Sequence, residues 1–441
     1  MQGNRGNELY VLKQVSIREI MNTILMRLRF QFAFGLVIIA GLPFLLLQNY
    51  SLRYTSSRDD SVFVAILSLI FCLYVFRRLT AYSSVLGSAF IIPTSSLVYG
   101  LSLIVLMLLR LDYSRFFLGM SYALNVFWFY TLYYFTVIAK RHAFALVPVG
   151  QVKTLARINK ADWVLLTEAA GDPRQMDKPC DAVITDFSAD MSDNWQRYLA
   201  RCALLGIPVF DYRHVREMLT GKVRITHISE NTLGTLTPNI FYMKLKTIVD
   251  FLIAILVLVV LAPVLILAAL LIKLDSPGPV LFRQKRIGYH GLPFHCYKFR
   301  TMEEDEASAG VEEDVLESAK TKPNDPRITR LGRFLRKCRI DELPQIFNIL
   351  KSEMSWIGPR PEVCVLSEWY EGELPFYSYR HVVKPGISGW AQVNQGHVVE
   401  VGDVHEKLQF DFYYIKNFSL WLDVSILFLT IKTIFTGSGA K

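Results

Sequence analysis

Four long apolar stretches in the first third of the chain constrain its fold more than any other feature of the sequence. They occupy residues 30–50, 61–76, 86–109 and 115–139 of the 441-residue chain. A helix needs about 20 apolar residues to span a bilayer, so three stretches are long enough. The second is marginal unless its flanking bases extend to the headgroups. Because their aromatic runs leave no polar face for water, we predict four transmembrane helices at 30–140 rather than the buried bundle of a soluble protein.

The bases that flank these stretches predict their orientation. Nine lie on one side, namely Arg5, Lys13, Arg18, Arg27, Arg29, Arg77, Arg78, Lys140 and Arg141. Four lie on the other side, namely Arg53, Arg58, Arg110 and Arg115. Since short loops rich in Lys and Arg stay in the cytoplasm, we expect residues 1–29 and everything after about residue 142 to be cytoplasmic.

The composition narrows the class of protein and its partners. Hydrophobic residues make up 52% of the chain and charged residues 20%, which is below the roughly 25% typical of soluble domains. The net charge of +9 accompanies this apolar excess. The sequence therefore predicts contact with anionic lipids or phosphorylated substrates and no nucleic-acid partner. Six scattered cysteines without a C-x-x-C pair predict neither a zinc site nor a disulfide framework.

Residues 141–240 form the next predicted domain, in which short apolar runs alternate with polar helical stretches. The predicted strands are 144–149, 163–166, 182–185 and 207–210, with a helix at 194–205. This alternation predicts a small, parallel, Rossmann-like α/β domain. Its first strand ends at Gly150 without a G-x-G-x-x-G pattern, so we expect a structural or regulatory role rather than dinucleotide binding. The domain is also a candidate surface for a homodimer.

A different kind of membrane segment follows at residues 248–272. The segment is apolar apart from Asp250 and contains Pro263 near its middle. Its length would suffice for a straight fifth span. Bases flank both ends, however, and a central proline bends a helix. These features favour a helix-break-helix that enters and leaves on the cytoplasmic face, with the straight span as the alternative.

Two other segments have less specific patterns. Residues 303–324 are acidic, which predicts a solvated loop or, alternatively, a mobile cover over a nearby site. Residues 417–435 are apolar but short for a span. They predict a helix in the plane of the lipid headgroups, with a core helix as the alternative.

Three basic blocks carry the candidate chemistry. They span residues 284–302, 325–337 and 358–362, and they include Lys298, Arg300, Arg327, Arg330 and Arg360. The planar guanidinium group binds phosphate oxygens bidentately, and nearby glycines let backbone N–H groups approach. A basic face that rests on anionic lipid fits the same residues, and composition does not separate the two interpretations.

An acidic pair, Asp341 and Glu342, lies between the second and third blocks. Asp341 resembles a helix N-cap, with Pro344 tolerated in the first turn. A helix N-terminus also favours the ionised carboxylate, which is the form that attacks phosphorus. Glu342 is placed to hold a divalent cation that neutralises phosphate charge. The alternative is a structural cap without chemistry.

Several ordered motifs between residues 244 and 434 resemble the bacterial sugar transferase family, the monotopic polyprenyl-phosphate phosphoglycosyl transferases. The matching segments are the helix broken at Pro263 and residues 297–302, 325–329, 341–345, 358–361, 384–393 and 411–414. The preceding half more loosely resembles the long form of these enzymes. The resemblance implies a membrane protein of the α and α/β classes. Its parts would be a four-helix transmembrane bundle, a small Rossmann-like α/β domain, and an α/β catalytic domain at 241–441 anchored by a proline-broken re-entrant helix.

The resemblance also implies a reaction at the cytoplasmic face of the bacterial inner membrane. Asp341 would attack the β-phosphorus of a UDP-sugar and expel UMP. Undecaprenyl phosphate would then take the phosphosugar, which gives undecaprenyl-diphosphate-sugar in the first membrane step of surface polysaccharide synthesis. Glu342 would bind Mg²⁺. The predicted substrate- and phosphate-binding residues are Lys298, Arg300, Arg327, Arg330, Arg360, Gln392 and His397.

Two departures from the family pattern bear on these expectations. Ala262 stands where members often have serine, so the break at Pro263 lacks that hydroxyl. Residues 394–397 replace a glycine followed by an arginine, and His397 is the candidate substitute for that arginine. The sugar stays open among glucose, galactose and N-acetylated hexosamines. A non-catalytic membrane scaffold for polysaccharide assembly is the alternative function.

Overall fold

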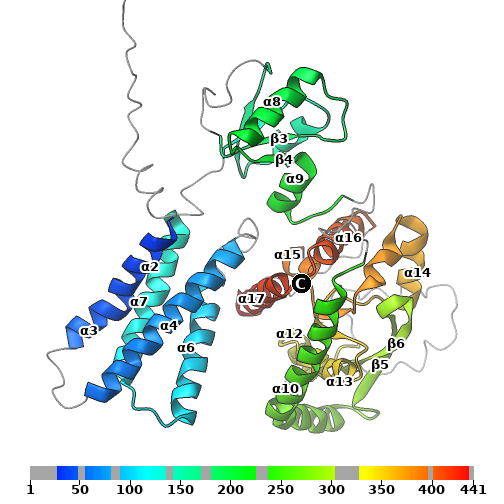
Figure 1. The fold of residues 1–441 in the computed structure, drawn as a ribbon. Coiled ribbons are helices and arrows are strands. Elements are labelled where there is room, and N and C mark those ends of the chain that lie inside the picture. Colours follow the sequence, from blue (N-terminus) through cyan, green and yellow to red (C-terminus); the bar gives the residue numbers. More distant parts are fainter. Residues whose placement is uncertain are drawn as a thin grey trace, which may run out of the picture. The chain divides into compact units, whose positions relative to one another are not determined.

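The chain folds into two compact units, Met1–Tyr212 and Arg213–Lys441 (Figure 1). The computed structural model describes residues 27–47, 55–80, 90–135, 143–169, 180–224, 237–302, 327–395 and 401–436. The predicted acidic segment 303–324 and His397 lie outside these residues.

The N-terminal unit begins with apolar helices that pack beside one another (Figure 1). They are α2 (Leu28–Leu36), which continues through the π-helical turn η1 (Val37–Gly41) into α3 (Leu42–Leu47), then α4 (Thr55–Thr80), α6 (Ile91–Leu108) and α7 (Arg115–Tyr133). Three segments here are long and apolar enough to cross a membrane, namely Leu28–Leu46, Asp60–Arg78 and Ile91–Leu108. They coincide with the first three predicted spans.

Helix α7 lies at the predicted fourth span and is long enough to cross a membrane, but it is less apolar than the other three segments. Part of its polar content lies inside the bundle. The Asn125 amide donates a hydrogen bond to Ser95 Oγ at 3.0 Å. The hydroxyls of Tyr99 and Ser121 lie 2.8 Å apart. Buried polar contacts of this kind hold helices together in a membrane, so α7 joins the bundle through hydrogen bonds as well as apolar packing.

A four-stranded parallel sheet follows, as the alternating pattern predicted. Its strands are β1 (Ala143–Leu146), β2 (Asp162–Leu165), β3 (Ala182–Thr185) and β4 (Val209–Asp211), in the order β2-β1-β3-β4. The connecting helices are η3 (Val152–Arg157) and α8 (Asp193–Leu204), and α9 (Tyr212–Thr220) begins after β4. The core forms where Tyr198, Leu199 and Cys202 of α8 pack on Ala145 and Val183 of the sheet.

The carboxyl edge between β1 and β3 is filled by the chain itself. Gly150 follows β1 with φ +61°, and a Cβ there would lie 2.3 Å from Asp186 Oδ2. The same carboxylate oxygen accepts a hydrogen bond from the backbone N–H of Gln151 at 3.1 Å. Parallel sheets of this kind bind phosphate groups at this edge. Here an internal carboxylate takes that place, which fits the missing glycine fingerprint.

The C-terminal unit is built on one long helix, a hairpin and a set of short elements. They are α10 (Ile240–Asp275), β5 (Leu281–Ile287), η5 (Tyr289–Gly291), β6 (Pro293–Phe299), α12 (Arg330–Lys337), η8 (Ile340–Gln345), α13 (Ile346–Leu350), β7 (Ser355–Ile357), α14 (Cys364–Glu373), η9 (Tyr377–Val382), β8 (Gly386–Ser388), α15 (Trp390–Asn394), α16 (Val401–Lys416) and α17 (Leu420–Thr436). Strands β5 and β6 pair antiparallel, and β7 and β8 pair parallel.

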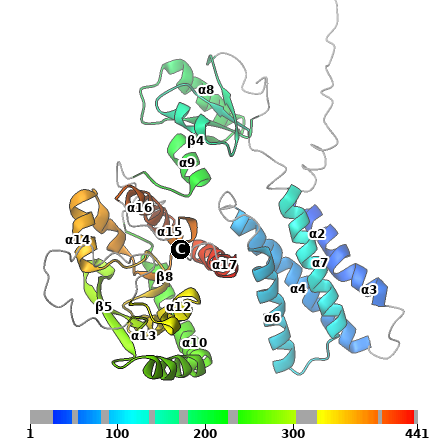
Figure 2. The same ribbon diagram turned by 180° about the vertical axis from the view of Figure 1, so that it is seen from behind.

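Helix α10 contains the predicted membrane segment but is longer and uninterrupted. Its 36 residues begin at Ile240 and continue through Pro263 to Asp275, so the chain bends rather than separating into two helices. The change of direction is visible in Figures 1 and 2. Leu256, Val260 and Leu267 are among the many apolar side chains that it exposes. Such a surface needs lipid or another apolar cover.

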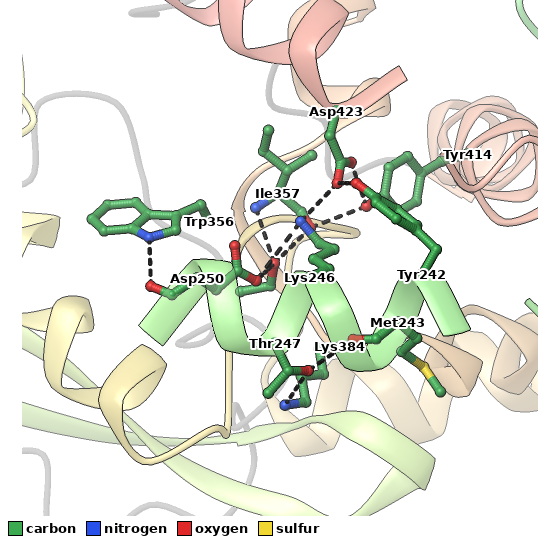
Figure 3. Close-up of polar contacts among 11 residues, drawn as sticks. Tyr242, Met243, Lys246, Thr247, Asp250, Trp356, Ile357, Lys384, Tyr414 and Asp423 are labelled. Atoms are coloured by element: carbon green, nitrogen blue, oxygen red, sulfur yellow. Dashed lines mark hydrogen bonds and ion pairs between the residues drawn. The ribbon is translucent and has the colours of Figure 1, made fainter. Parts of the chain in front are cut away.

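A cluster of polar groups fixes the first half of α10 to the rest of the unit (Figure 3). Lys246 forms ion pairs with Asp423 of α17 at 2.8 Å and with Asp250 at 3.7 Å. Asp423 also accepts hydrogen bonds from the hydroxyls of Tyr242 and Tyr414, at 2.6 and 2.8 Å. Ionisable residues in an apolar helix require such partners, so this face of α10 packs on protein.

The same turns of α10 hold the segments around β7 and β8. Asp250 accepts a hydrogen bond from Ser355 Oγ at 2.6 Å, and its main-chain oxygen accepts one from Trp356 Nε1 at 3.2 Å. Lys384 Nζ donates to Thr247 Oγ1 at 3.2 Å. We call this set the anchor cluster, which comprises Tyr242, Lys246, Thr247, Asp250, Ser355, Trp356, Lys384, Tyr414 and Asp423 (Figure 3).

Helix α17 packs on this unit as the core-helix interpretation of the C-terminal apolar stretch predicts, and it also exposes Leu420, Leu427 and Ile434. Leu422, Ile426, Phe428 and Leu429 are buried on it. Its Asp423 belongs to the anchor cluster. The helix therefore contributes to the interior of this unit along most of its length.

Candidate active site

Three elements bring the predicted acidic pair together with two bases. Strand β6 carries Lys298, η8 carries Asp341 and Glu342, and the segment after β7 carries Arg360. β6 packs directly on η8. The hairpin that presents β6 turns tightly at residues 288–292, where His290 adopts φ 57°.

Glu342 is the centre of the charge contacts in this site. Its Oε1 accepts a hydrogen bond from Arg360 Nη2 at 2.6 Å and one from Lys298 Nζ at 3.4 Å. Arg339 Nη1 lies 3.7 Å from Oε2. Burial acts to raise the pKa of Glu342, but the charges of Arg360 and Lys298 outweigh it and hold that pKa well below its usual range. Glu342 therefore stays ionised at any physiological pH.

Asp341 differs from its neighbour in having no fixed partner. Its side chain is half-buried, and none of the described residues donates a hydrogen bond to it or pairs with it. Burial and the charge of Glu342 raise the pKa of Asp341, while Lys298, Arg336 and Arg360 act to lower it. An unengaged carboxylate among bases has its oxygens available to an incoming group.

The backbone around Asp341 departs from the predicted N-cap. The cap position of η8 is Arg339, in the left-handed conformation with φ 57°, and Asp341 lies inside the 3₁₀ turn. Pro344 is also inside this turn, where its missing N–H costs little. A non-glycine residue held in the left-handed region is a strained conformation that surrounding contacts must stabilise. The strain lies two residues before Asp341.

The site carries more positive than negative charge. Four bases act on the acidic pair, namely Lys298, Arg336, Arg339 and Arg360. Burial and the charge of Arg360 lower the pKa of Lys298. Two carboxylates cannot neutralise four bases, so the site attracts a multivalent anion such as a diphosphate. Sequence reasoning singled out the block that contains Arg336 but did not assign it or Arg339 to the site.

The structure gives Arg300 a different set of contacts from the predicted phosphate contact. Its guanidinium donates hydrogen bonds to the main-chain oxygens of Ser276 and Pro277, at 2.7 and 2.8 Å, and to Ser276 Oγ at 2.9 Å. A Cβ at Gly278 would lie 2.0 Å from the same guanidinium. Arg300 thus ties β6 to the end of α10. Its role as a phosphate ligand was predicted from the family motif, which does not indicate that its guanidinium is engaged by the end of α10.

The other predicted binding residues are not gathered around Glu342 by any contact in the described part of the chain. Arg327 precedes α12 and Arg330 begins it, and both are exposed. Gln392 Nε2 donates to the Ile387 oxygen at 3.1 Å, and Gln392 Oε1 is buried with no donor among the described residues. The binding roles of these residues remain predictions.

The carboxylates suit the predicted Mg²⁺ in one respect. The described residues hold no group of three or more His, Cys, Asp and Glu side chains that could enclose a metal ion. Mg²⁺, however, takes one or two protein carboxylates and completes its shell with water and phosphate oxygens. The adjacent pair Asp341 and Glu342 matches that donor set.

Comparison with known proteins agrees with this geometry. The family model described as bacterial sugar transferase matches residues 241–437. The chain is 42% identical over 386 residues to the UDP-N-acetylgalactosamine-undecaprenyl-phosphate N-acetylgalactosaminephosphotransferase of Aeromonas hydrophila, with 86% of each chain covered. It is 42% identical over 244 residues to the UDP-glucose:undecaprenyl-phosphate glucose-1-phosphate transferase of Escherichia coli K12, which covers 54% of this chain and 50% of that protein.

Proposed function

Because the chain belongs to the bacterial sugar transferase family, we propose that it transfers a sugar 1-phosphate from a UDP-sugar to undecaprenyl phosphate. The products are UMP and undecaprenyl-diphosphate-sugar, as in the first membrane step of a surface polysaccharide. The observation that carries the proposal is the half-buried Asp341, to which none of the described residues donates a hydrogen bond, beside Glu342 among four bases. The relatives' names, which specify this transfer, support it.

The transfer proceeds through a phosphosugar on Asp341. A carboxylate oxygen of Asp341 attacks the β-phosphorus of the UDP-sugar and forms an O–P bond, while the bond to the bridging oxygen breaks and UMP leaves. A phosphate oxygen of undecaprenyl phosphate then attacks the same phosphorus and releases the carboxylate. The free Asp341 oxygens support this route, because a carboxylate already committed to an ion pair is a poorer nucleophile.

Glu342 and the bases organise the diphosphate around Asp341. Arg360 and Lys298 keep Glu342 ionised and fixed, and Asp341 and Glu342 together are the residues that would hold Mg²⁺. When bound, the metal neutralises charge on the diphosphate and on the departing UMP. Arg336 and Arg339 supply further positive charge at the same place.

We place the site at the cytoplasmic face of the inner membrane, with α10 as a re-entrant helix. Bases flank both ends of its apolar segment, and the ribbon bends along its length (Figure 2). Phe241 and Leu274 near its two ends are 78% and 84% exposed. Cysteines at these two positions, in a background lacking the exposed Cys338, should both react with an impermeant maleimide from the cytoplasmic side. Reaction from opposite sides would show a straight span instead.

We further propose that the domain built on the parallel sheet is Rossmann-like and has a structural or regulatory role. In this proposal the same domain provides the contact surface of a homodimer. Its strand order and the carboxylate at its edge support a role other than dinucleotide binding. The exposed apolar side chain of Leu204 on α8 offers a reporter. A cysteine at Leu204 should crosslink two copies, and a monomer that resists crosslinking in the membrane would contradict the dimer.

The decisive experiment measures UMP release by the purified full-length protein with undecaprenyl phosphate and a panel of UDP-sugars. UDP-N-acetylgalactosamine is tested first, because the relative matched over 86% of both chains is named for it. UDP-glucose follows, because a second relative is named for that donor. UMP release with one donor supports the proposal and identifies the sugar. No release with any donor would favour the non-catalytic scaffold.

A further inference from the structure

The short segment that carries Arg360 is held through its main chain by two other arginines. Arg380 Nη2 donates a hydrogen bond to the Arg360 oxygen at 2.9 Å. Arg286 Nη1 donates one to the Pro361 oxygen at 2.5 Å. The Arg360 guanidinium is meanwhile the group that reaches Glu342. One arginine therefore fixes the backbone of another whose side chain is in the site.

Arg380 is itself buried, and both of its terminal nitrogens are engaged by neighbouring groups. The residue is 3% exposed. Its Nη1 donates to the Tyr377 hydroxyl at 2.7 Å, and its Nη2 forms an ion pair with Asp411 at 2.9 Å. Glu362 lies 3.8 Å from Nη1 and pairs with Lys407. Burying an arginine is costly unless its charge and donors are satisfied. These contacts engage both terminal nitrogens, whereas Nε is buried with no acceptor among the described residues, and none of them gives Arg380 access to a substrate.

The backbone leading to Arg360 has little freedom at its other end. Gly358 crosses β8 so closely that a Cβ at Gly386 would lie 2.1 Å from the Gly358 nitrogen. The Gly358 amide donates to the Ser388 oxygen at 2.9 Å. The segment is thus fixed before Arg360 by this crossing and after it by Arg380 and Arg286. Its position depends on both fixed points.

We propose that Arg380 is a positioning residue for the transfer reaction. It holds the main chain of Arg360 so that the Arg360 guanidinium meets Glu342, and it acts without touching the substrate. The inference rests on the proposed function, because it assigns a role within the same site. The planar fork is required, since its two terminal nitrogens serve Tyr377, Asp411 and the Arg360 oxygen in fixed directions. A lysine would keep the charge near Asp411 but could not reach all three.

The test compares Arg380→Lys with Tyr377→Phe in the full-length protein. Arg380→Lys should lower kcat for UMP release by about 10- to 100-fold, as loss of a supporting contact does. KM for the UDP-sugar should change by less than about threefold, because no substrate contact is lost. Tyr377→Phe removes a bond to Nη1 of the same arginine but leaves the tether from Nη2. It should lower the unfolding temperature and leave kcat near the wild-type value.

A double-mutant cycle separates positioning from general stability. If Arg380 acts through Arg360, then adding Arg380→Lys to Arg360→Lys should lower kcat by less than about twofold further. A purely structural residue would shift the unfolding temperature and give additive effects on kcat in this cycle.

The possible results distinguish this proposal from the proposed function. A folded Arg380→Lys protein with wild-type kcat, or fully additive effects in the cycle, would refute the positioning role while the transfer activity stands. If Arg380→Lys does not fold, Asp411→Asn weakens the hold on Nη2 of the same guanidinium, and unchanged kcat in that folded variant would refute the role. Absence of UMP release from the wild type with every donor would refute the proposed function and this inference with it.

Discussion

Two clusters of charged side chains in the C-terminal unit are built from similar residues but differ in balance. The anchor cluster has two acids, Asp250 and Asp423, and two bases, Lys246 and Lys384 (Figure 3). The site around Asp341 and Glu342 has two acids and four bases. The charges are therefore matched in the first cluster and unmatched in the second.

The clusters also differ in how completely their carboxylates are used. Asp423 accepts hydrogen bonds from two tyrosine hydroxyls besides its ion pair with Lys246, and Asp250 accepts one from Ser355. Asp341 accepts none from any described residue. A satisfied and neutral cluster holds helices together, whereas an incomplete and positively charged one leaves a position for an anion. The comparison predicts that mutations in the anchor affect stability and those in the site affect chemistry.

The largest effect should come from Asp341→Asn. The amide cannot form the acyl phosphate, so UMP release should fall by at least about 10³-fold, as it does when a covalent nucleophile is removed. The unfolding temperature should not fall, because none of the described residues donates a hydrogen bond to Asp341 and burial disfavours its charge. Asp403→Asn, at an exposed carboxylate of α16, is the control and should keep full activity. Equal activity in the two variants would contradict the assignment of the nucleophile.

The next effect in size is expected for Glu342→Gln. Loss of the charge that Arg360 and Lys298 neutralise should lower kcat by about 10²- to 10³-fold, the size seen when one electrostatic group of an active site is removed. The dependence of the residual rate on Mg²⁺ concentration should shift to higher metal. Glu368→Gln, on the exposed face of α14, removes the same charge elsewhere. A wild-type Mg²⁺ dependence in Glu342→Gln would remove Glu342 from the metal site.

Asp423→Ala should show the opposite pattern. It leaves Lys246 with Asp250 as its remaining ion partner among the described residues and removes an acceptor of the Tyr242 and Tyr414 hydroxyls, which costs about 3 kcal/mol. The unfolding temperature should fall by roughly 6–12 °C. At temperatures where the variant is folded, kcat should stay within about threefold of wild type. A large loss of kcat without loss of stability would break the comparison between the two clusters.

The smallest change is expected in the pH dependence of kcat. Only ionised Asp341 attacks, and burial with the Glu342 charge raises its pKa, so activity should fall about tenfold per pH unit below that pKa. The midpoint of this acid limb of the pH profile should lie above the pKa of about 3.9 of an ordinary aspartate. In Glu342→Gln the neighbouring charge is gone, so the limb of the residual rate should move to lower pH. A limb that does not move would show that the two carboxylates are not coupled.

The parts of this molecule that could be predicted from sequence are those set by local pattern. The strands of the parallel sheet were predicted from short apolar runs, because burial on both faces of a strand needs such runs. Asp341 and Glu342 were recognised because adjacent carboxylates among arginines are visible without any fold. Helix α7 was less apolar than expected, and its buried Asn125 and Ser121 form hydrogen bonds with residues of α6.

The parts that could not be predicted depend on contacts between distant residues. Tyr242 and Asp423 are 181 positions apart, and nothing in either segment indicates that they meet. Arg300 was assigned to phosphate because it matches an arginine of the family motif, yet its guanidinium donates to Ser276 and Pro277. The N-cap expected at Asp341 was displaced because Arg339 adopts a left-handed conformation. A sequence motif therefore indicates the residue types of a site, but it does not show which arginine side chains point into that site.

The central claim is tested most directly by mass spectrometry of the protein after incubation with its UDP-sugar donor and Mg²⁺ in the absence of undecaprenyl phosphate. The account predicts release of up to one equivalent of UMP and a phosphosugar adduct on the peptide that contains Asp341. The adduct should disappear when undecaprenyl phosphate is added and should never form in Asp341→Asn. UMP release that requires undecaprenyl phosphate from the first turnover, with no adduct on the protein, would contradict the account.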